Sequence, residues 1–171
     1  MFTSPNIFSA KTGDIPELVL LINKAYKGES SKRAWTSERN LFDGLRTNEN
    51  ALSELLGDEN AIILKYVNDN GAIVGCVYLQ KQESQIYLGL LCVSPDIQAA
   101  GIGKQLLIAA EEYAQKKNCN KIVLTVISIR HELVEWYKRN GYHQLGIKPF
   151  PQDKINIPNQ ELELFILEKK T

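Results

Sequence analysis

Three consecutive strand-forming stretches constrain the fold of this 171-residue chain more than any other feature, and they lie at 61–67, 73–82 and 85–93. Asn70 and Gly71 stand between the first two stretches, and an Asn-Gly pair between apolar runs is a strong hairpin signal. A tight polar turn at Glu83 and Ser84 separates the second stretch from the third. The sequence therefore predicts an antiparallel meander.

A helix and a buried strand follow the meander. Residues 103–117 place Leu106, Leu107 and Ala110 on one face of an amphipathic helix. Residues 121–127 form a nearly unbroken apolar run, which is typical of a strand covered on both faces. A strand, a crossover helix and a second strand make a parallel, right-handed unit. We therefore expect an α/β domain whose mixed sheet is antiparallel at first and then parallel.

The other elements are expected on either side of this centre. Asp14 is predicted to cap a helix that starts beside it, with Pro16 in the first turn and Glu17 three residues on. A helical region is expected over 35–56, broken near Thr47, with Asn48 capping its second half. Further expected elements are a strand at 7–11, a helix at 132–140, a final strand at 162–169 and a long loop with three prolines at 147–159. Long ordered loops often line sites.

The composition fits one globular domain over residues 1–171. At 44% apolar and 23% charged residues, a chain of this length builds a core without disulfide or metal staples. The 20 basic and 20 acidic residues give a net charge of zero, so no global field steers the protein to nucleic acid or to an anionic membrane. No basic stripe interleaved with aromatic residues appears either. Neither nucleic acid nor a membrane is an expected partner.

The cysteine pattern indicates reduced thiols and no metal site. Cys76, Cys92 and Cys119 form no C-X-X-C pair, and with His131 and His143 they show no metal-ligand spacing. Buried, reduced thiols suit a reducing compartment. The first ten residues lack the basic stretch and apolar core of a secretory signal, and the apolar runs are far shorter than the roughly 20 residues that span a bilayer. A cytoplasmic protein is expected.

A glycine loop between strand and helix carries the most information about function; residues 91–104 read LCVSPDIQAAGIGK. Gly101 and Gly103 allow a positive φ and a close approach of the backbone, so successive N–H groups can converge on phosphate oxygens. The start of the helix adds the positive end of its dipole. Leu106 replaces the third glycine of a dinucleotide fingerprint, and Gln98 replaces the first glycine of a Walker loop. The loop is predicted to bind phosphate mainly through its main chain.

The motifs around this loop have a recognisable order. A Val-X-Pro strand end at 93–95 and Gln-X-X-Gly-X-Gly at 98–103 precede the amphipathic helix and the buried strand, and WYKRNGY follows at 136–142. In this order the chain resembles the GNAT superfamily of acetyl-CoA-dependent N-acetyltransferases. The specific resemblance covers 85–146, and the order of elements matches over nearly the whole chain. It implies a mixed sheet of six to seven strands with about four flanking helices.

The resemblance implies acetyl-CoA as the cofactor. In this family the glycine loop cradles the pyrophosphate, and the end of the preceding strand, which bulges and splays from its neighbour, binds the acetyl carbonyl and the pantetheine arm. The matching cofactor-binding positions here are Leu91, Cys92, Val93, Gln98, Ala99, Ala100, Gly101, Ile102, Gly103 and Lys104. Arg130 stands where the family often has an Asn that contacts the cofactor, and its charge suits a phosphate instead.

Tyr137 matches the family's general acid, whose hydroxyl faces the thioester sulfur and so also contacts the cofactor. An unperturbed tyrosine has a pKa near 10 and a thiol one near 8.5, so full proton transfer is uphill by roughly 2 kcal/mol. A strong hydrogen bond and outright delivery of the proton therefore both stay open. The alternative is an aromatic residue that only packs beside Trp136.

The general base and the acceptor site are less constrained. Glu29 and Glu38 flank the loop through which acceptors usually enter in this family, and both are candidate bases. Gly89 lies where several relatives carry a carboxylate, which favours a water relay or a base from another element. The cations around the indole of Trp35 are Lys32, Arg33 and Arg46. They form either a site for a carboxylate or phosphate of the acceptor or an ordinary charged surface. The candidate substrate-binding residues are Tyr26, Arg33, Trp35 and Tyr87.

Two functions follow from the resemblance. The first is transfer of an acetyl group from acetyl-CoA to a primary amine, on a small molecule or a peptide, by direct attack in a ternary complex. The second is a non-catalytic acyl-CoA-binding or sensing module with the same fold, which the missing obvious base favours. Many relatives are dimers, so a homodimer stays open as well.

Overall fold

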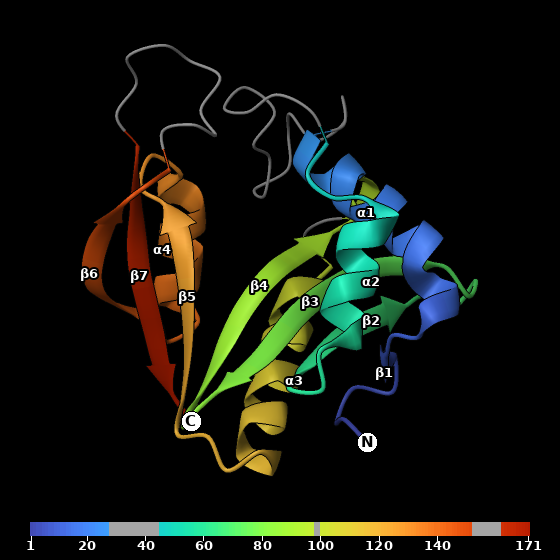
Figure 1. Ribbon diagram of the computed structural model, residues 1–171, viewed down its shortest axis with the longest axis horizontal. Coiled ribbons are helices and arrows are strands. Elements are labelled where there is room, and N and C mark those ends of the chain that lie inside the picture. The colour runs from blue at the N-terminus through green and yellow to red at the C-terminus, as the bar shows by residue number, and fades with distance from the viewer. Residues whose placement is uncertain (28–44, 98–99, 152–161) are drawn as a thin grey trace.

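The computed structural model of the chain describes residues 1–27, 45–97, 100–151 and 162–171 (Figure 1). Its sheet has seven strands in the order β1-β2-β3-β4-β5-β7-β6. The strands are β1 (Ile7–Ser9), β2 (Ala61–Val67), β3 (Ile73–Gln82), β4 (Gln85–Val93), β5 (Lys121–Ile127), β6 (His143–Pro149) and β7 (Glu163–Lys170). β4 and β5 run parallel, whereas the other neighbouring strands run antiparallel. The predicted mixed sheet is confirmed.

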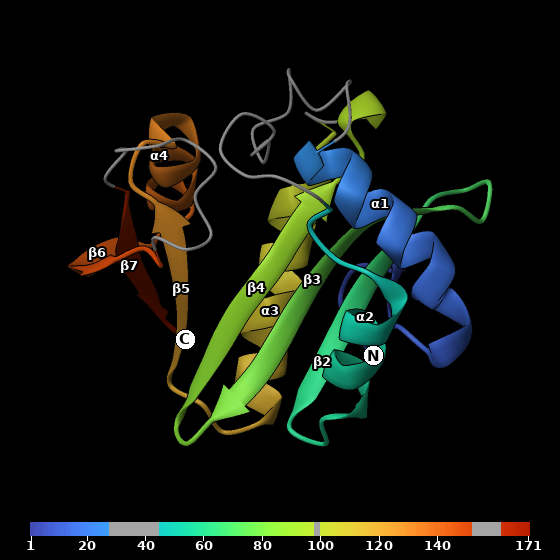
Figure 2. The same cartoon turned by 45° about the horizontal axis from the view of Figure 1, so that its top comes forward.

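Helices cover both faces of the sheet (Figure 2). The four are α1 (Ile15–Lys27), α2 (Glu49–Gly57), α3 (Ile102–Lys116) and α4 (His131–Arg139). Residues of α1 and α2 share one buried apolar cluster with β3 and the end of β4, while α3 and α4 share a second cluster on the opposite face. We call these the α1 face and the α3 face. No helix in the described ranges is long and apolar enough to cross a membrane.

The meander matches its predicted boundaries, because turn residues and apolar runs agree there. Asn68 organises the β2–β3 turn by accepting main-chain hydrogen bonds from Asn70 and Ala72, and Gly71 adopts the positive φ of +81° that the turn needs. The predicted cap of α2 is also confirmed, since the Asn48 side chain accepts from the Ala51 N–H at 2.9 Å. Local sequence signals decide these elements.

β6 corrects the predicted loop at 147–159. The strand begins at His143 and runs to Pro149, so the chain is extended over the start of the expected loop. β6 is the outer strand of the sheet and is exposed along almost its whole length, which removes the apolar alternation by which strands are recognised. A register shift around Leu145, together with Gly146 and Pro149, weakens the signal further.

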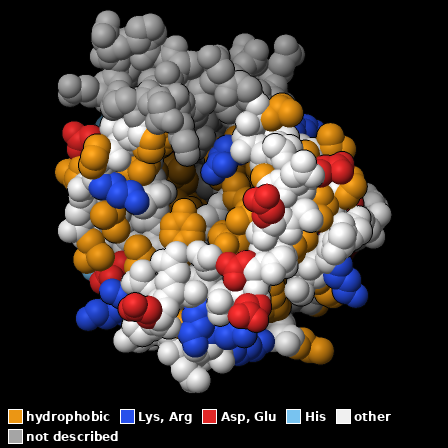
Figure 3. All heavy atoms as spheres, in the orientation of Figure 1, with side chains coloured by type: hydrophobic (Ala, Val, Ile, Leu, Met, Phe, Trp, Pro, Cys, Tyr) orange, Lys and Arg blue, Asp and Glu red, His pale blue; other side chains and the backbone are white. Residues whose placement is uncertain are grey.

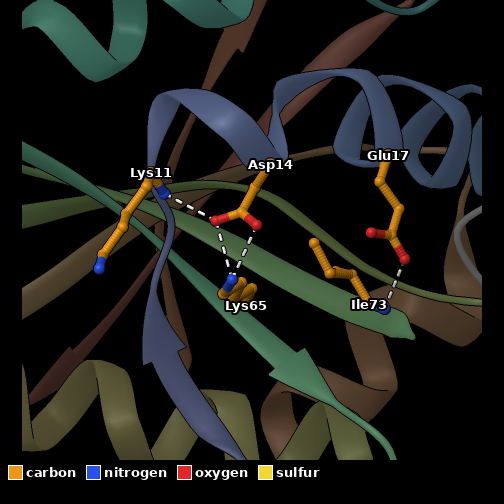
Figure 4. A network of polar contacts seen from close by, with 5 residues as sticks. All are labelled: Lys11, Asp14, Glu17, Lys65 and Ile73. Atoms are coloured by element: carbon orange, nitrogen blue, oxygen red, sulfur yellow. Dashed lines mark hydrogen bonds and ion pairs between the residues drawn. The ribbon is translucent and has the colours of Figure 1, made fainter. Parts of the chain in front are cut away.

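The start of α1 also differs from the expected cap (Figure 4). Asp14 lies in a short 3-10 turn, Thr12–Asp14, and its carboxylate accepts from the Lys11 N–H at 2.8 Å and pairs with the Lys65 ammonium at 2.8 Å. Glu17 accepts from the Ile73 N–H at 2.8 Å. The two carboxylates therefore tie α1 to β2 and β3. The local capping box lies one turn earlier than expected, between Lys11 and Asp14 in the 3-10 turn.

Replacing Asp14 with asparagine is expected to lower the free energy of unfolding at pH 7 by about 1–2 kcal/mol, because charge-assisted hydrogen bonds are lost. Burial tends to raise the pKa of Asp14, but the bonds from Lys65 and Lys11 outweigh it and hold that pKa below its usual range. The stabilisation is therefore fully present above the unfolded pKa near 4 and is progressively lost as the pH falls from there through the lower folded pKa. Urea unfolding at pH 7 and pH 3 measures this, and an equal loss at both values contradicts the ion pair.

Candidate active site

β4 and β5 separate after only a short stretch of pairing. Their register pairs join Gln85 to Lys121, Ile86 to Ile122 and Tyr87 to Val123. Beyond Tyr87, β4 continues beside β3 and β5 continues beside β7, and the two strands diverge (Figure 1). The β5-facing main chain of later β4 is thus released from the sheet ladder. The surface in this view is hollowed between the two halves of the molecule, with hydrophobic side chains around the hollow (Figure 3).

A bulge lies in β4 beside this separation. Cys76 pairs with Cys92 and Tyr78 with Gly89, so the register advances two residues along β3 but three along β4. Leu90, within this stretch, has a φ of +48°, a conformation that a leucine adopts only under strain. Bulges re-aim side chains and main chain, and here Leu88 packs on the α3 face whereas Leu90 packs on the α1 face.

Tyr26 fastens α1 to the bulge. Its hydroxyl donates to the carbonyl of Leu91 at 3.0 Å, and its side chain is buried, with the Arg46 guanidinium 5.2 Å from the ring centroid. Tyr26, a predicted acceptor-binding residue, therefore supports the main chain of β4 through its hydroxyl. Its contact with an acceptor stays a prediction.

The thiols beside the bulge are buried and unbridged. Cys76 and Cys92 are fully buried, and their Sγ atoms lie 3.6 Å apart. The hydrogen bond to Cys92 and burial together raise the pKa of Cys76, so this thiol stays protonated. Cys119 is also buried and free. The predicted buried thiols are confirmed, and Cys92, whose side chain packs on the α1 face, has only its main chain to offer a ligand.

Gly101 heads α3 in the conformation that the glycine loop predicts. It is the N-cap of α3 with a φ of +77°, and a Cβ placed on it would have no heavy atom within 4 Å. The first N–H groups of a helix have no intrahelical acceptor, so open space lies beside a set of donors that suits an anion. Gly103 is different, because it lies buried inside α3 and is absent from the described glycines with a positive φ. The expected positive φ is thus confirmed for Gly101 alone.

The other predicted cofactor-binding residues differ in how exposed they are. Leu91, Cys92, Val93 and Ile102 are buried, while Ala100 and Lys104 are exposed. The turn that leads into the loop is held from α1, where the Lys24 ammonium pairs with the Asp96 carboxylate. This ion pair has no signature in the sequence, because its partners lie far apart in the chain.

Tyr137 lies in α4 with 5% of its surface exposed. Its ring packs edge-on against Trp136 and Tyr142, with centroids 5.1 and 5.5 Å away. Burial raises the pKa of Tyr137 above its ordinary range, the positive charge of Arg130 opposes this rise, and Tyr87 adds to it. The hydroxyl therefore stays protonated at neutral pH and can donate. Arg130 is the N-cap of α4, two turns before Tyr137 on the same side of the helix.

Several predicted site residues lie outside the described ranges. These are Glu29, Arg33, Trp35 and Glu38, together with Gln98 and Ala99 of the glycine loop. Within the described ranges, no group of three or more His, Cys, Asp or Glu side chains is arranged to hold a metal ion. The structure places Tyr26 against the main chain of the β4 bulge and Tyr87 at the point where β4 and β5 separate.

Known proteins share this fold. The ribosomal-protein-S18-alanine N-acetyltransferase from Escherichia coli is 16% identical with a TM-score of 0.71, over 96% of this chain and 92% of that one. A probable acetyltransferase from Staphylococcus epidermidis is 13% identical with a TM-score of 0.74, over 97% and 98% of the two chains. A putative streptothricin acetyltransferase from Bacillus anthracis, solved in complex with acetyl coenzyme A, is 19% identical with a TM-score of 0.61, over 70% and 67%.

Sequence comparison identifies the family. No curated protein matches the sequence significantly. The model of the acetyltransferase (GNAT) family, however, matches residues 24–142, which is well over half of the 171 residues. The match begins within α1 and ends just after α4, so it contains the bulge of β4, the start of α3 and Tyr137. The chain therefore belongs to the GNAT family of acetyltransferases.

Proposed function

We propose that this protein is an N-acetyltransferase that moves an acetyl group from acetyl-CoA to a primary amine of a small molecule or a peptide, within a ternary complex. One observation carries the proposal. β4 separates from β5, the open N-terminus of α3 follows β4, and the buried hydroxyl-bearing ring of Tyr137 lies on α4, the helix that follows β5. Acetyl-CoA is long, with charged phosphates toward one end and a reactive thioester at the other. Its site therefore needs both the N-terminus of α3 and the hydroxyl of Tyr137.

The residues present fit acetyl-CoA. The open space beside Gly101 and the first N–H groups of α3 suit a pyrophosphate, which they can hold without a basic side chain. Lys104 is exposed on the first turn of the same helix and is available to a phosphate oxygen. The released main chain of β4, next to Leu91 and Val93, suits the amides of a pantetheine arm, which would continue the sheet in the place that β5 leaves.

The thioester of acetyl-CoA supplies an acetyl group that is activated toward an amine. The N–H groups of β4 beyond the bulge would polarise the acetyl oxygen, because fixed donors stabilise charge that develops there. Tyr137 would donate a hydrogen bond to the departing sulfur. The pKa of Tyr137 is raised, so it differs even more from the pKa of the departing thiol. A hydrogen bond without full proton transfer therefore fits better than delivery of the proton.

An acceptor screen tests the proposal. The panel contains an alanine-initiated peptide, streptothricin and phosphinothricin, because solved relatives carry these words in their names, together with lysine and a polyamine. Thiol release from acetyl-CoA is followed with each amine, and calorimetry with coenzyme A runs alongside. We expect release that depends on at least one amine. Binding of coenzyme A with no amine-dependent release points to the acyl-CoA-sensing module, and no binding overturns the cofactor assignment.

The pH dependence of turnover tests the state of Tyr137. Because its pKa is raised, the hydroxyl keeps its proton up to and beyond the ordinary value near 10, and its contribution is lost only above that. The ratio of wild-type turnover to that of Tyr137→Phe should therefore be constant from pH 7 to about pH 10. Turnover of both proteins with one panel amine measures the ratio. A ratio that already falls near pH 8–9 contradicts the protonated donor.

A further inference from the structure

Tyr87 lies at the point where β4 and β5 begin to separate. It is the last residue of β4 that pairs with β5, opposite Val123. Its side chain is half-buried and packs with the α1-face cluster. The position is therefore the point at which the sheet divides, on the face opposite to that of α3 and α4.

Gly89 makes room for the ring of Tyr87. A Cβ on Gly89 would lie 3.2 Å from Cε1 of Tyr87 and 3.6 Å from its hydroxyl oxygen, with Cδ1 of Tyr78 also at 3.6 Å. The ring thus leans along β4 over residue 89, and its hydroxyl end is directed toward the bulge. The φ of Gly89 is not among the positive values of the described residues, so the glycine is required for space and not for backbone conformation.

Tyr87 and Tyr137 approach the opening from opposite faces. Tyr137 belongs to the apolar cluster of the α3 face, and Tyr87 packs against that of the α1 face. Tyr87 also contributes to the raised pKa of Tyr137. If Tyr137 faces the sulfur of the donor, Tyr87 would lie on the opposite face of the sheet, from which a second substrate could reach the same carbonyl.

We propose that the Tyr87 hydroxyl oxygen accepts a hydrogen bond from the N–H of the acceptor amine and holds the nitrogen lone pair toward the acetyl carbonyl. The inference rests on the proposed acetyl transfer. A phenol that accepts from the amine still has its own proton to donate to water, so it orients the nitrogen without needing a charge.

The test compares Tyr87→Phe with Tyr66→Phe, which loses the same hydroxyl from β2 on the α3 face. The probe is the panel amine with the fastest thiol release. For Tyr87→Phe, kcat/KM for the amine should fall about tenfold, the loss of one ordinary hydrogen bond, while KM for acetyl-CoA stays within about twofold. Tyr66→Phe should match the wild type. An unchanged kcat/KM for the amine, or an equal loss for acetyl-CoA, overturns the role of Tyr87 and leaves the acetyl transfer standing.

Gly89→Ala provides a second, independent variant. Its methyl group would crowd Cε1 of Tyr87 at 3.2 Å, so the ring must shift, and the amine should again lose several-fold in kcat/KM. Gly57→Ala, at a glycine with nothing within 4 Å, is the matched control. If Tyr87→Phe does not fold, Gly89→Ala tests the role of Tyr87 in its place. Absence of release with every panel amine would instead remove the proposed transfer, and this inference with it.

Discussion

Replacing Tyr137 with phenylalanine is expected to lower turnover by about 10²- to 10⁴-fold, the usual contribution of a positioned acid. The ring and its contacts with Trp136 and Tyr142 remain, so the affinity for acetyl-CoA should change by less than about twofold. The loss therefore falls on a hydrogen bond that strengthens as charge develops on sulfur. Steady-state turnover with a panel amine and calorimetry with coenzyme A measure the two quantities separately.

Tyr142→Phe is the matched control for this prediction. Tyr142 is buried against Tyr137, and its hydroxyl is buried with no hydrogen-bond partner among the described residues. Removal of an unpaired buried hydroxyl should leave stability equal or slightly higher and turnover unchanged. If Tyr137→Phe keeps wild-type turnover, or if both variants lose it equally, Tyr137 is a packing residue.

Replacing Gly101 with glutamate is expected to abolish measurable binding of coenzyme A. The new side chain would enter the open space at the start of α3 and bring a negative charge to the place proposed for the pyrophosphate. At an effective dielectric constant of about 20, two unit charges about 5 Å apart repel by roughly 3 kcal/mol, which weakens binding by more than about a hundredfold. The positive φ of +77° adds roughly 1 kcal/mol of backbone strain for any residue with a Cβ.

Gly71→Glu separates strain from charge. Gly71 has nearly the same φ, +81°, and equally open surroundings, but it lies in the β2–β3 turn. Both variants should therefore lose similar stability in thermal unfolding, and only Gly101→Glu should lose coenzyme A in calorimetry. If Gly101→Glu kept its affinity for coenzyme A, the proposed phosphate site at the start of α3 would be wrong.

The sequence predicts those elements that local residues specify. The meander over 61–93 and the strand at 121–127 have the expected boundaries, because turn residues mark their ends and apolar runs fill them. The glycine loop likewise predicts the positive φ of Gly101 at the start of α3. A family motif indicates Tyr137 as a general acid, and this role stays a prediction. In each case neighbouring residues alone carry the signal.

Features that depend on distant partners could not be predicted. Asp14 caps the 3-10 turn before α1 and also pairs with Lys65, 51 residues away, a partner that the neighbouring residues do not indicate. The bulge of β4 is expected from the family resemblance alone, because it lies inside an apolar run and no residue type around Leu90 marks its positive φ. The contact between Tyr87 and Gly89 has no distinctive signal in the sequence, because it is recognised only once the bend of the strand is known. β6 is missed because a solvent-exposed strand needs no apolar pattern.

The outer strands of the sheet bear on how the protein behaves at high concentration. β1 has only three residues, which is too short to recruit another strand firmly. At the opposite border, β6 carries a bulge, Lys148, and Pro149, which has no N–H to donate; such features discourage strand addition. The sheet is thus protected against growth at both borders. Among the described strands, these borders therefore disfavour a homodimer formed by joining two sheets edge to edge.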